Sequence, residues 1–275
     1  ATVAVGRSGM TDAYEELAEI DVRAAINLML RNPSYEPSAG RLRAETLLRK
    51  HNSLVNTMAR IVVANDNGSL RTVSGGTHHA SGWYPSVKVG RTQHYESLHQ
   101  LALIERCETD PNVVHYQSEA RRFEFILRKK ERYTSDVDIL DADGRLAVVE
   151  VKGDDADLRD PEYRLKLAGV AEICRRVGHE FRITFGSEIF ENSRHRFNVR
   201  LASSMRRTAI SSSQKRLVES LRSKGDDMQL GEFAELMAPG NFVQGRAITF
   251  AMLVRRIVSL DLTQPLIDEM PVSFI

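Results

Sequence analysis

The segment YTSDVDILDADGRLAVVEVKGDD, residues 133–155, decides the fold class. Two runs rich in Val, Ile and Leu flank Ala142-Asp143-Gly144, and an Asp-Gly step between two such runs predicts a β-hairpin. The flanking sequence predicts a helix at 96–108, a turn leading into a strand within 110–118, a strand at 121–130, a helix at 161–178 and a strand at 180–185. This order of elements predicts an α/β unit with a mixed sheet.

The second strand of the hairpin carries charged residues beside apolar ones. Residues two apart in a strand project from one face, so Glu150 and Lys152 point one way while Val149 and Val151 point into the core. Asp136 begins the first strand, and its carboxylate can reach the same edge. The sequence leaves two interpretations open: solvated charges on a wet strand face, or groups that are held together for chemistry.

If they are held for chemistry, these side chains suit a metal-assisted hydrolysis. The carboxylates of Asp136 and Glu150, with a backbone carbonyl, form a hard-oxygen site of the kind that Mg²⁺ accepts. Lys152 beside that site can orient or deprotonate a metal-activated water, or offset charge on an attacked phosphate. The barrier to phosphodiester hydrolysis is largely electrostatic, so the three residues favour that reaction.

The composition sets limits on the class of protein. The 275 residues are 42% hydrophobic and 27% charged, which is typical of a soluble globular protein with room for two modest domains. The 38 basic residues balance 37 acidic ones, so a nucleic-acid surface has to come from local clustering. Cys107 and Cys174 fall within apolar helical patterns without a zinc-site spacing, which predicts core thiols in a reducing compartment. We see no membrane-length apolar run and no signal peptide, and therefore expect a cytoplasmic protein.

The two ends of the chain differ in texture from the middle. Apolar spacing predicts helices at 11–31 and about 39–60, followed by a Gly- and Ser-rich loop with room for one strand. This part indicates no function. Near the other end, short helices at 213–225 and 228–238 and a third that starts at 245 precede two strands within 257–275. This order favours a helix-turn-helix with a two-stranded wing, and a small helical packing module is the open alternative.

The sequence thus predicts three regions. They are an N-terminal helical extension (1–80), the α/β core (81–203) and a winged-helix-like C-terminal domain (204–275).

The hairpin strands resemble those of the PD-(D/E)xK nuclease core. Tyr133-Thr134-Ser135-Asp136 opens one strand, with Ser135 in the place of the family's Pro, and Ala147-Val148-Val149 leads into Glu150-Val151-Lys152-Gly153. The resemblance implies a restriction-endonuclease-like mixed sheet flanked by helices. In that core a helix before the strands usually adds another acidic ligand.

The preceding segment makes the resemblance narrower. Residues 88–125, KVGRTQHYESLHQLALIERCETDPNVVHYQSEARRFEF, are similar to the start of the TnsA-type endonuclease subunit of heteromeric transposons. That family carries a Gly-Arg step, Glu-Ser-x-x-Glu on a helix and then Asp-Pro-x-Val. The matching residues here are Gly90-Arg91, Glu96-Ser97, Asp110-Pro111 and Val113. The resemblance covers about residues 81–190, and 205–275 is similar to the family's winged-helix part.

One departure from the family concerns the helical acid. The second Glu of Glu-Ser-x-x-Glu falls on Gln100, and Glu96 lies four residues earlier on the same helical face. Glu96 supplies the carboxylate, or Gln100 ligates metal through its amide oxygen, or the site is weakened. The resemblance implies that Glu96, Asp136, Glu150 and Lys152 are catalytic, and that Asp136, Glu150, Glu96 and Gln100 ligate the metal.

The resemblance also implies an activity and partners. We expect an Mg²⁺-dependent DNA endonuclease, with Mn²⁺ able to substitute, that hydrolyses the strand at transposon 5′ ends during cut-and-paste transposition, a form of DNA recombination. Its partners would be double-stranded transposon ends, a TnsB-like DDE transposase and a TnsC-like AAA+ ATPase that binds the C-terminal part, with no membrane. Two alternatives are a stand-alone nuclease of restriction, repair or phage origin, and a non-catalytic protein with a degenerate nuclease fold that docks DNA or a transposase.

Basic residues near the hairpin suggest a place for DNA. Arg121, Arg122, Lys129 and Lys130 flank the strand predicted at 121–130, and we predict that they contact DNA phosphates next to the active site. A solvated strand face is the alternative. Arg255-Arg256, at the end of the third C-terminal helix, touch the DNA backbone or cap that helix.

Overall fold

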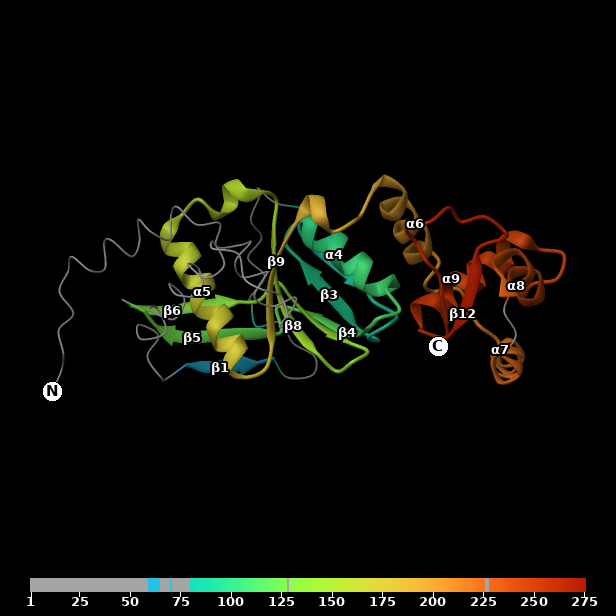
Figure 1. The fold of residues 1–275 in the computed structure, drawn as a ribbon, viewed down its shortest axis with the longest axis horizontal. Helices are drawn as coiled ribbons and strands as arrows, with labels where there is room; N and C mark the ends of the chain where they lie inside the picture. The colour runs from blue at the N-terminus through green and yellow to red at the C-terminus, as the bar shows by residue number, and fades with distance from the viewer. Residues whose placement is uncertain (1–58, 65–69, 71–79, 128, 226–227) are drawn as a thin grey trace, which may run out of the picture. The chain divides into compact units, whose positions relative to one another are not determined.

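The computed structural model describes residues 59–64, 70, 80–127, 129–225 and 228–275 (Figure 1). Within these ranges it is a mixed α/β protein with six α-helices and several small sheets. The helix predicted at 11–31 lies outside the described residues, as does all of the helix predicted at 39–60 except its last two positions. Arg60 begins a strand, so the predicted end of that helix is wrong. None of the helices in the described ranges combines the length and the apolar composition that a membrane span needs.

The chain divides into two compact units. Of the described residues, the first unit contains 59–64, 70, 117–127, 129–139 and 144–187, and the second contains 80–116, 140–143, 188–225 and 228–275. Both units are therefore assembled from separate stretches of the sequence. The predicted boundaries after residues 80 and 203 stay a prediction, and the second of them falls at the end of helix α6 (Ser193–Ser204).

Three antiparallel strands of the first unit form a sheet in the order β1-β5-β6. The strands are β1 (Arg60–Val63), β5 (Arg121–Ile126) and β6 (Lys130–Thr134). The single strand predicted at 121–130 is thus wrong at its C-terminal end, because the chain turns and returns as β6. The turn bears a Leu127 N–H to Lys129 carbonyl hydrogen bond of 3.1 Å, and it lies in a basic run without Gly or Pro. The usual sequence signal for a turn is therefore missing.

A second sheet has the order β4-β7-β8-β9. Its strands are β4 (Val113–Ser118), β7 (Val137–Asp141), β8 (Leu146–Lys152) and β9 (Glu180–Phe185). The predicted hairpin is present, since β7 and β8 are neighbours and Gly144 in the turn has a φ of 77°, a conformation that favours glycine. The predicted helix at 161–178 is α5 (Pro161–Arg176), which connects β8 to its parallel neighbour β9. The predicted mixed α/β sheet is confirmed.

Helix α5 lies over β5 and β6 in Figure 1, and with residues of β5, β6, β8 and β9 it forms the core of the first unit. Asp160 caps its N-terminus by accepting a hydrogen bond from the Glu162 N–H, and Pro161 follows at the first helical position. The core is formed by Phe123, Phe125, Tyr133, Val148, Leu158, Leu165, Leu167, Val170, Ala171, Ile173, Cys174, Phe181, Ile183 and Phe185. The side chain of Cys174 is buried and free, as is that of Cys107, which confirms both as core thiols.

The second unit has a hairpin and most of the helices. Its hairpin pairs β2 (Gly82–Pro85) with β3 (Thr92–Tyr95), in a stretch where the sequence indicated loop with one strand. The helices are α4 (Leu98–Thr109), α6 (Ser193–Ser204), α7 (Ser212–Lys224), α8 (Leu230–Met237) and α9 (Phe242–Val254). Three short strands, β10 (Met228–Gln229), β11 (Val258–Ser259) and β12 (Pro271–Phe274), form an antiparallel sheet in the order β10-β12-β11.

The C-terminal elements pack around one core. The residues that form it are Val199, Ala202, Val218, Leu221, Leu230, Phe233, Met237, Ile248, Phe250, Met252, Leu253, Val258, Leu260, Leu262, Met270 and Val272. The three helices and the strand pair that the sequence predicts after residue 212 are confirmed as elements.

Candidate functional site

Strand β8 places Glu150 and Lys152 side by side. Their carboxylate Oε1 and ammonium Nζ lie 2.7 Å apart. Val149 and Val151 on the opposite face are buried, but Glu150 is also buried, with 3% of its surface exposed. The interpretation of Glu150 as a solvated surface charge is therefore wrong. A carboxylate in such a position has lost its water and needs partners inside the protein.

Two tyrosines supply the other partners of Glu150. The Tyr133 hydroxyl donates to Oε2 at 2.5 Å, and the Tyr163 hydroxyl donates to Oε1. With Lys152, these contacts occupy three of the roughly four lone-pair positions of a carboxylate. Burial, and then the charge of Glu150, raise the pKa of Tyr133 well above its ordinary value, so its hydroxyl stays a donor. The Lys152 ammonium also lies 4.8 Å from the centre of the Tyr163 ring.

Asp136 lies directly before β7 and reaches the backbone of β8. Its Oδ2 accepts a hydrogen bond of 2.8 Å from the N–H of Val151, the residue between Glu150 and Lys152. The structure therefore brings together the three residues of the hairpin that the sequence singled out. Glu150 and Lys152 come from β8, and Asp136 is the residue before its neighbour β7.

Glu119 is a further acidic residue beside Asp136. It is buried, with 1% exposed, and its φ of 51° is in the left-handed region that non-glycine residues rarely adopt. Its N–H donates to the Asp136 carbonyl at 3.0 Å, and its own carbonyl accepts from the Leu70 N–H at 3.1 Å. A strained backbone that is tied down on both sides often marks a functional position.

A group of potential metal ligands includes Glu119. His94, Glu96 and Glu119 carry side chains of the types that ligate metal ions. Of the ligands predicted from the sequence, Glu96 alone belongs to this group. His94 and Glu96 are two residues apart at the end of β3, a spacing that places side chains on one face and that the sequence could have revealed. Nothing in the sequence singles out Glu119.

Glu96 and Gln100 differ in position from what the sequence predicts. Helix α4 begins at Leu98 because the Ser97 hydroxyl caps it by accepting from the Gln100 N–H at 3.0 Å. Glu96 therefore precedes the helix, and the prediction that it shares a helical face with Gln100 is wrong. The Gln100 amide oxygen accepts from the Glu96 N–H at 2.7 Å. The structure thus shows a capping contact for this oxygen, and metal binding by Gln100 stays a prediction.

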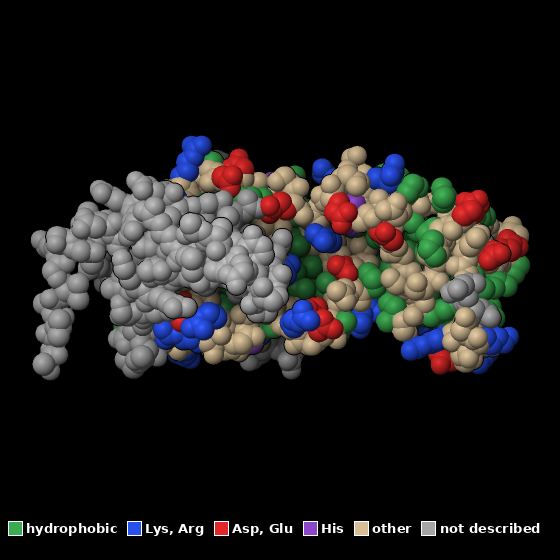
Figure 2. Space-filling model, in the orientation of Figure 1, with side chains coloured by type: hydrophobic (Ala, Val, Ile, Leu, Met, Phe, Trp, Pro, Cys, Tyr) green, Lys and Arg blue, Asp and Glu red, His purple; other side chains and the backbone are tan. Residues whose placement is uncertain are grey.

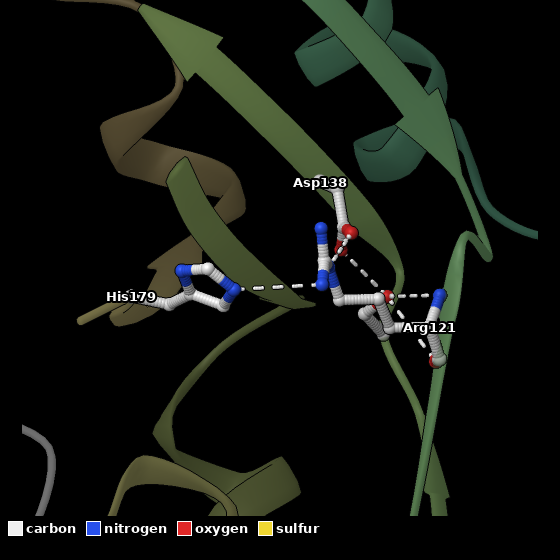
Figure 3. Close-up of polar contacts among 4 residues, drawn as sticks. Arg121, Asp138 and His179 are labelled. Carbon is white, nitrogen blue, oxygen red and sulfur yellow. Dashed lines mark hydrogen bonds and ion pairs between the residues drawn. The ribbon is translucent and has the colours of Figure 1, made fainter. Parts of the chain in front are cut away.

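Arg121 lies in a polar cluster inside the first unit. Figure 3 shows its side chain between Asp138 and His179, and the guanidinium Nε is 2.5 Å from the Asp138 carboxylate. Its Nη1 is 3.5 Å from the His179 Nε2. Asp138 also accepts from the Ser135 hydroxyl at 2.8 Å, and burial raises the pKa of Asp138 against the opposing effect of Arg121. Arg121 thus neutralises a buried carboxylate, and its predicted contact with DNA is untested.

The other predicted DNA contacts lie nearer the solvent. Arg122 pairs with Glu124 at 2.8 Å on β5, and Lys129 pairs with Glu162 at 3.4 Å with both side chains exposed. Lys130 is exposed at the start of β6. Such surface pairs are weak and exchange readily for a phosphate, so these positions stay predicted DNA contacts.

The sequence matches no known protein-family model, and it matches no curated protein. The function therefore has to be argued from the residues and from their geometry.

Proposed function

We propose that this protein is a metal-dependent DNA endonuclease of the TnsA type. The observation that carries the proposal is the grouping of Asp136, directly before β7, with Glu150 and Lys152 of the neighbouring strand β8, with the Asp136 carboxylate on the N–H between the other two residues. Burying a carboxylate with an ammonium 2.7 Å away costs free energy, since both groups lose hydration. The presence of such a pair therefore favours a functional role. A restriction-endonuclease-like core of the PD-(D/E)xK type is part of the proposal.

Each residue has a defined role in the proposed reaction. The tyrosine hydroxyls of Tyr133 and Tyr163 fix the orientation of Glu150, so its carboxylate is positioned before substrate arrives. Lys152 is a fifth exposed and can reach an attacking water or a phosphate oxygen from its place beside Glu150. A general acid or base in this position contributes about 10²–10⁴ to the rate.

A divalent cation is the proposed cofactor. When bound, it would neutralise charge on the attacked phosphate and lower the pKa of water. Two sets of residues support it: the carboxylates of Asp136 and Glu150, and the potential ligands His94, Glu96 and Glu119. Carboxylates suit Mg²⁺ and Mn²⁺, and an imidazole favours transition metals, so Mn²⁺ is the better first probe.

The C-terminal elements support a DNA-associated role. Helices α7, α8 and α9 followed by the antiparallel pair β11 and β12 have the order of a winged-helix domain. As part of the proposal, a DDE transposase would act at the other strand of each transposon end, and an AAA+ ATPase would bind the C-terminal part. Cytoplasmic location is part of the same proposal.

Nicking of supercoiled plasmid tests the proposal. We expect wild-type protein with Mn²⁺ or Mg²⁺ to nick DNA, alone or with a cognate DDE transposase, and EDTA to abolish the reaction. Asp136→Asn should lower the rate by about 10²-fold or more, because it removes a charge from the proposed metal site. Asp143→Asn is the matched control, since Asp143 lies in the exposed hairpin turn and should leave the rate unchanged.

The outcomes separate the alternatives. Cleavage that requires the transposase favours the TnsA type, and cleavage without it favours a stand-alone nuclease. If the wild-type protein and Asp136→Asn are equally inactive with both metals and with the transposase, the protein is not a nuclease, and DNA or transposase docking takes its place.

A further inference from the structure

Helix α7 carries four Lys and Arg residues, more than any other helix of the second unit in the described ranges. Residues 211–225 contain Lys215, Arg216, Arg222 and Lys224 against Glu219, which gives a net charge of 4 − 1 = +3. All four basic side chains are exposed, and Figure 2 shows Lys and Arg gathered over this helix. None of the four has an ion pair or side-chain hydrogen bond to another residue in the described ranges. They are therefore available to a partner.

The opposite face of α7 is anchored to the unit. Val218 and Leu221 are buried in the C-terminal core, and the Gln214 side-chain amide donates to the Met237 carbonyl at 2.7 Å. A capping box at Ser211 fixes the start of the helix, and Gly225 with a φ of 70° ends it. These contacts fix the orientation of α7, so its basic side chains stay exposed to solvent.

The elements that follow α7 have no exposed Lys or Arg in the described ranges. Helix α9 is buried from Gly245 to Val254 except for Arg246, and its exposed first turn is uncharged. Arg246 itself donates to the Leu266 carbonyl at 2.7 Å and lies 3.4 Å from Asp268. The strand region 257–275 contains three acidic residues and no Lys or Arg.

The arginines at the end of α9 are also occupied. Arg255 donates to the carbonyls of Ala251 and Arg206, and Arg256 donates to the carbonyl of Pro111. For Arg255, the structure therefore shows the contact that caps the helix. Residues 228–275 carry five acidic and three basic residues, a net charge of −2, which repels a phosphate backbone.

We infer that the exposed face of α7 is the surface with which the second unit binds the DNA backbone. The inference rests on the proposed function, since it takes double-stranded DNA as the substrate, and it assigns the electrostatic contact to α7 in place of α9. From Lys215 to Lys224 the helix rises by about 13 Å, a length over which duplex DNA carries roughly eight phosphates. Four basic side chains on this span match a run of phosphates without reading base sequence.

The salt dependence of DNA binding tests this inference. Binding of full-length protein to a fluorescent duplex of random sequence would be measured by anisotropy in EDTA at several NaCl concentrations. Two double variants, Lys215→Gln/Arg216→Gln and Arg222→Gln/Lys224→Gln, remove two charges each from α7. The control Arg194→Gln/Arg196→Gln removes two exposed charges from α6 of the same unit. Gln, Lys and Arg have similar helix propensities, so folding should be unaffected.

We expect each α7 pair to reduce the slope of log K against log [NaCl] by about 1.8, because each lost phosphate contact contributes about 0.9. Affinity at 0.1 M salt should fall roughly tenfold, and the α6 pair should leave both quantities nearly unchanged. Equal effects of the α6 and α7 pairs, no effect of either α7 pair, or wild-type protein that binds no duplex would each overturn the inference.

Failure of the inference and failure of the proposed function can be told apart. If wild-type protein nicks DNA and the α7 variants bind as tightly as wild type, the α7 assignment fails and the nuclease remains. Conversely, DNA binding that depends on α7 in a protein that never nicks DNA supports the surface and removes the nuclease. If the true partner of α7 is an acidic protein, the α7 variants will bind DNA as tightly as wild type does.

Discussion

The environment of Glu150 shows how a single buried charge organises the site. Removing a carboxylate from water costs several kcal/mol, even after the protein has relaxed around it. Tyr133, Tyr163 and Lys152 offset this cost by three hydrogen bonds or ion pairs. Such a network holds one geometry of the carboxylate, which a catalytic site requires.

Arg121 and Arg122 are adjacent in the sequence but contribute very differently to stability. Arg121 neutralises Asp138, which is buried, whereas Arg122 forms a pair with Glu124 nearer the surface. We expect Arg121→Ala to lower the free energy of unfolding by about 3 kcal/mol or more, because it leaves a buried charge unpaired. Arg122→Ala should cost about 1 kcal/mol or less. Urea denaturation of both variants measures the difference.

A double variant provides the control for the Arg121 prediction. Arg121→Ala/Asp138→Asn removes both charges and should recover part of the stability that Arg121→Ala loses. If Arg121→Ala were as stable as Arg122→Ala, Arg121 would have no structural role and a direct contact with DNA would be favoured.

Lys88 makes stability depend on pH. Burial lowers the pKa of Lys88 from its ordinary 10.5 to about 8, although its ammonium donates to the Cys107 and Asp110 carbonyls. Between these two pH values the unfolded chain binds more protons than the folded protein, so stability rises with pH, by at most about 1.4 kcal/mol per pH unit. We expect Lys88→Met to remove this rise, as measured by urea denaturation from pH 7 to pH 10.

Comparison of Lys88→Met with wild type at each pH isolates the lysine from other groups. The raised pKa of Tyr84, caused mainly by burial, makes stability fall above about pH 10 in both proteins, because the unfolded chain then releases its proton first. Parallel pH profiles of the two proteins between pH 8 and 10 would contradict the assignment to Lys88.

Some residues of the site can be predicted from the sequence and others cannot. Glu150 and Lys152 follow from the two-residue period of a strand, which needs no knowledge of distant contacts. The backbone contact of Asp136 needs only the hairpin. Glu119 is different, because its importance comes from a left-handed φ and from burial, and neither has a signature in the residue type.

At the scale of elements, the crossing of α8 and α9 depends on Gly245. A Cβ on Gly245 would lie 2.0 Å from the Ala234 carbonyl oxygen, a backbone atom of α8 that cannot move aside alone. We expect Gly245→Ala to lower the free energy of unfolding by about 3 kcal/mol or more, although Ala is the better helix former by about 1 kcal/mol. Urea denaturation of the variant tests this.

Gly169→Ala on α5 is the graded comparison. There a Cβ would meet the Phe125 ring at 2.7 Å, and a side chain can yield where a backbone cannot. The expected loss is about 1 kcal/mol, smaller than at Gly245. If both variants lost the same stability, close backbone packing of α8 on α9 would not be the cause.

The elements themselves were predicted with uneven success for physical reasons. Helix α5 and strand β9 carry strong local signals, since Asp160 and Pro161 start the helix and Gly178 follows its end. The sequence did not predict strand β6, because the turn before it has no Gly or Pro. Helix α4 begins later than predicted, because the Ser97 hydroxyl caps the helix. Local chemistry thus decides most element boundaries.

At the scale of the molecule, the grouping of segments could not be predicted. Residues 80–116 belong to the same compact unit as the described residues from 188 onward, although the two segments lie far apart in the sequence. Such grouping depends on contacts between residues far apart in the chain, such as the 2.6 Å hydrogen bond between the hydroxyls of Tyr84 and Ser203. Hydrophobic periodicity carries no information about which distant segment is the partner.

The net charge of the whole molecule is nearly zero, but basic and acidic residues are concentrated in different segments. The net charge is +1, yet α7 carries a surplus of +3 while the region after it is acidic. The net charge of the whole chain therefore does not indicate the proposed DNA surface, whereas a count of charged residues along exposed faces does.

The initial rate of plasmid nicking by wild type and by Lys152→Met, each with Mn²⁺ and each confirmed as folded by near-UV circular dichroism, tests the central claim most directly. We predict that wild-type protein nicks DNA and that Lys152→Met is slower by about 10²-fold or more, because the ammonium beside Glu150 acts on the attacking water or on the phosphate. Equal rates for the two folded proteins would contradict the assignment of the Asp136, Glu150 and Lys152 group as a nuclease site.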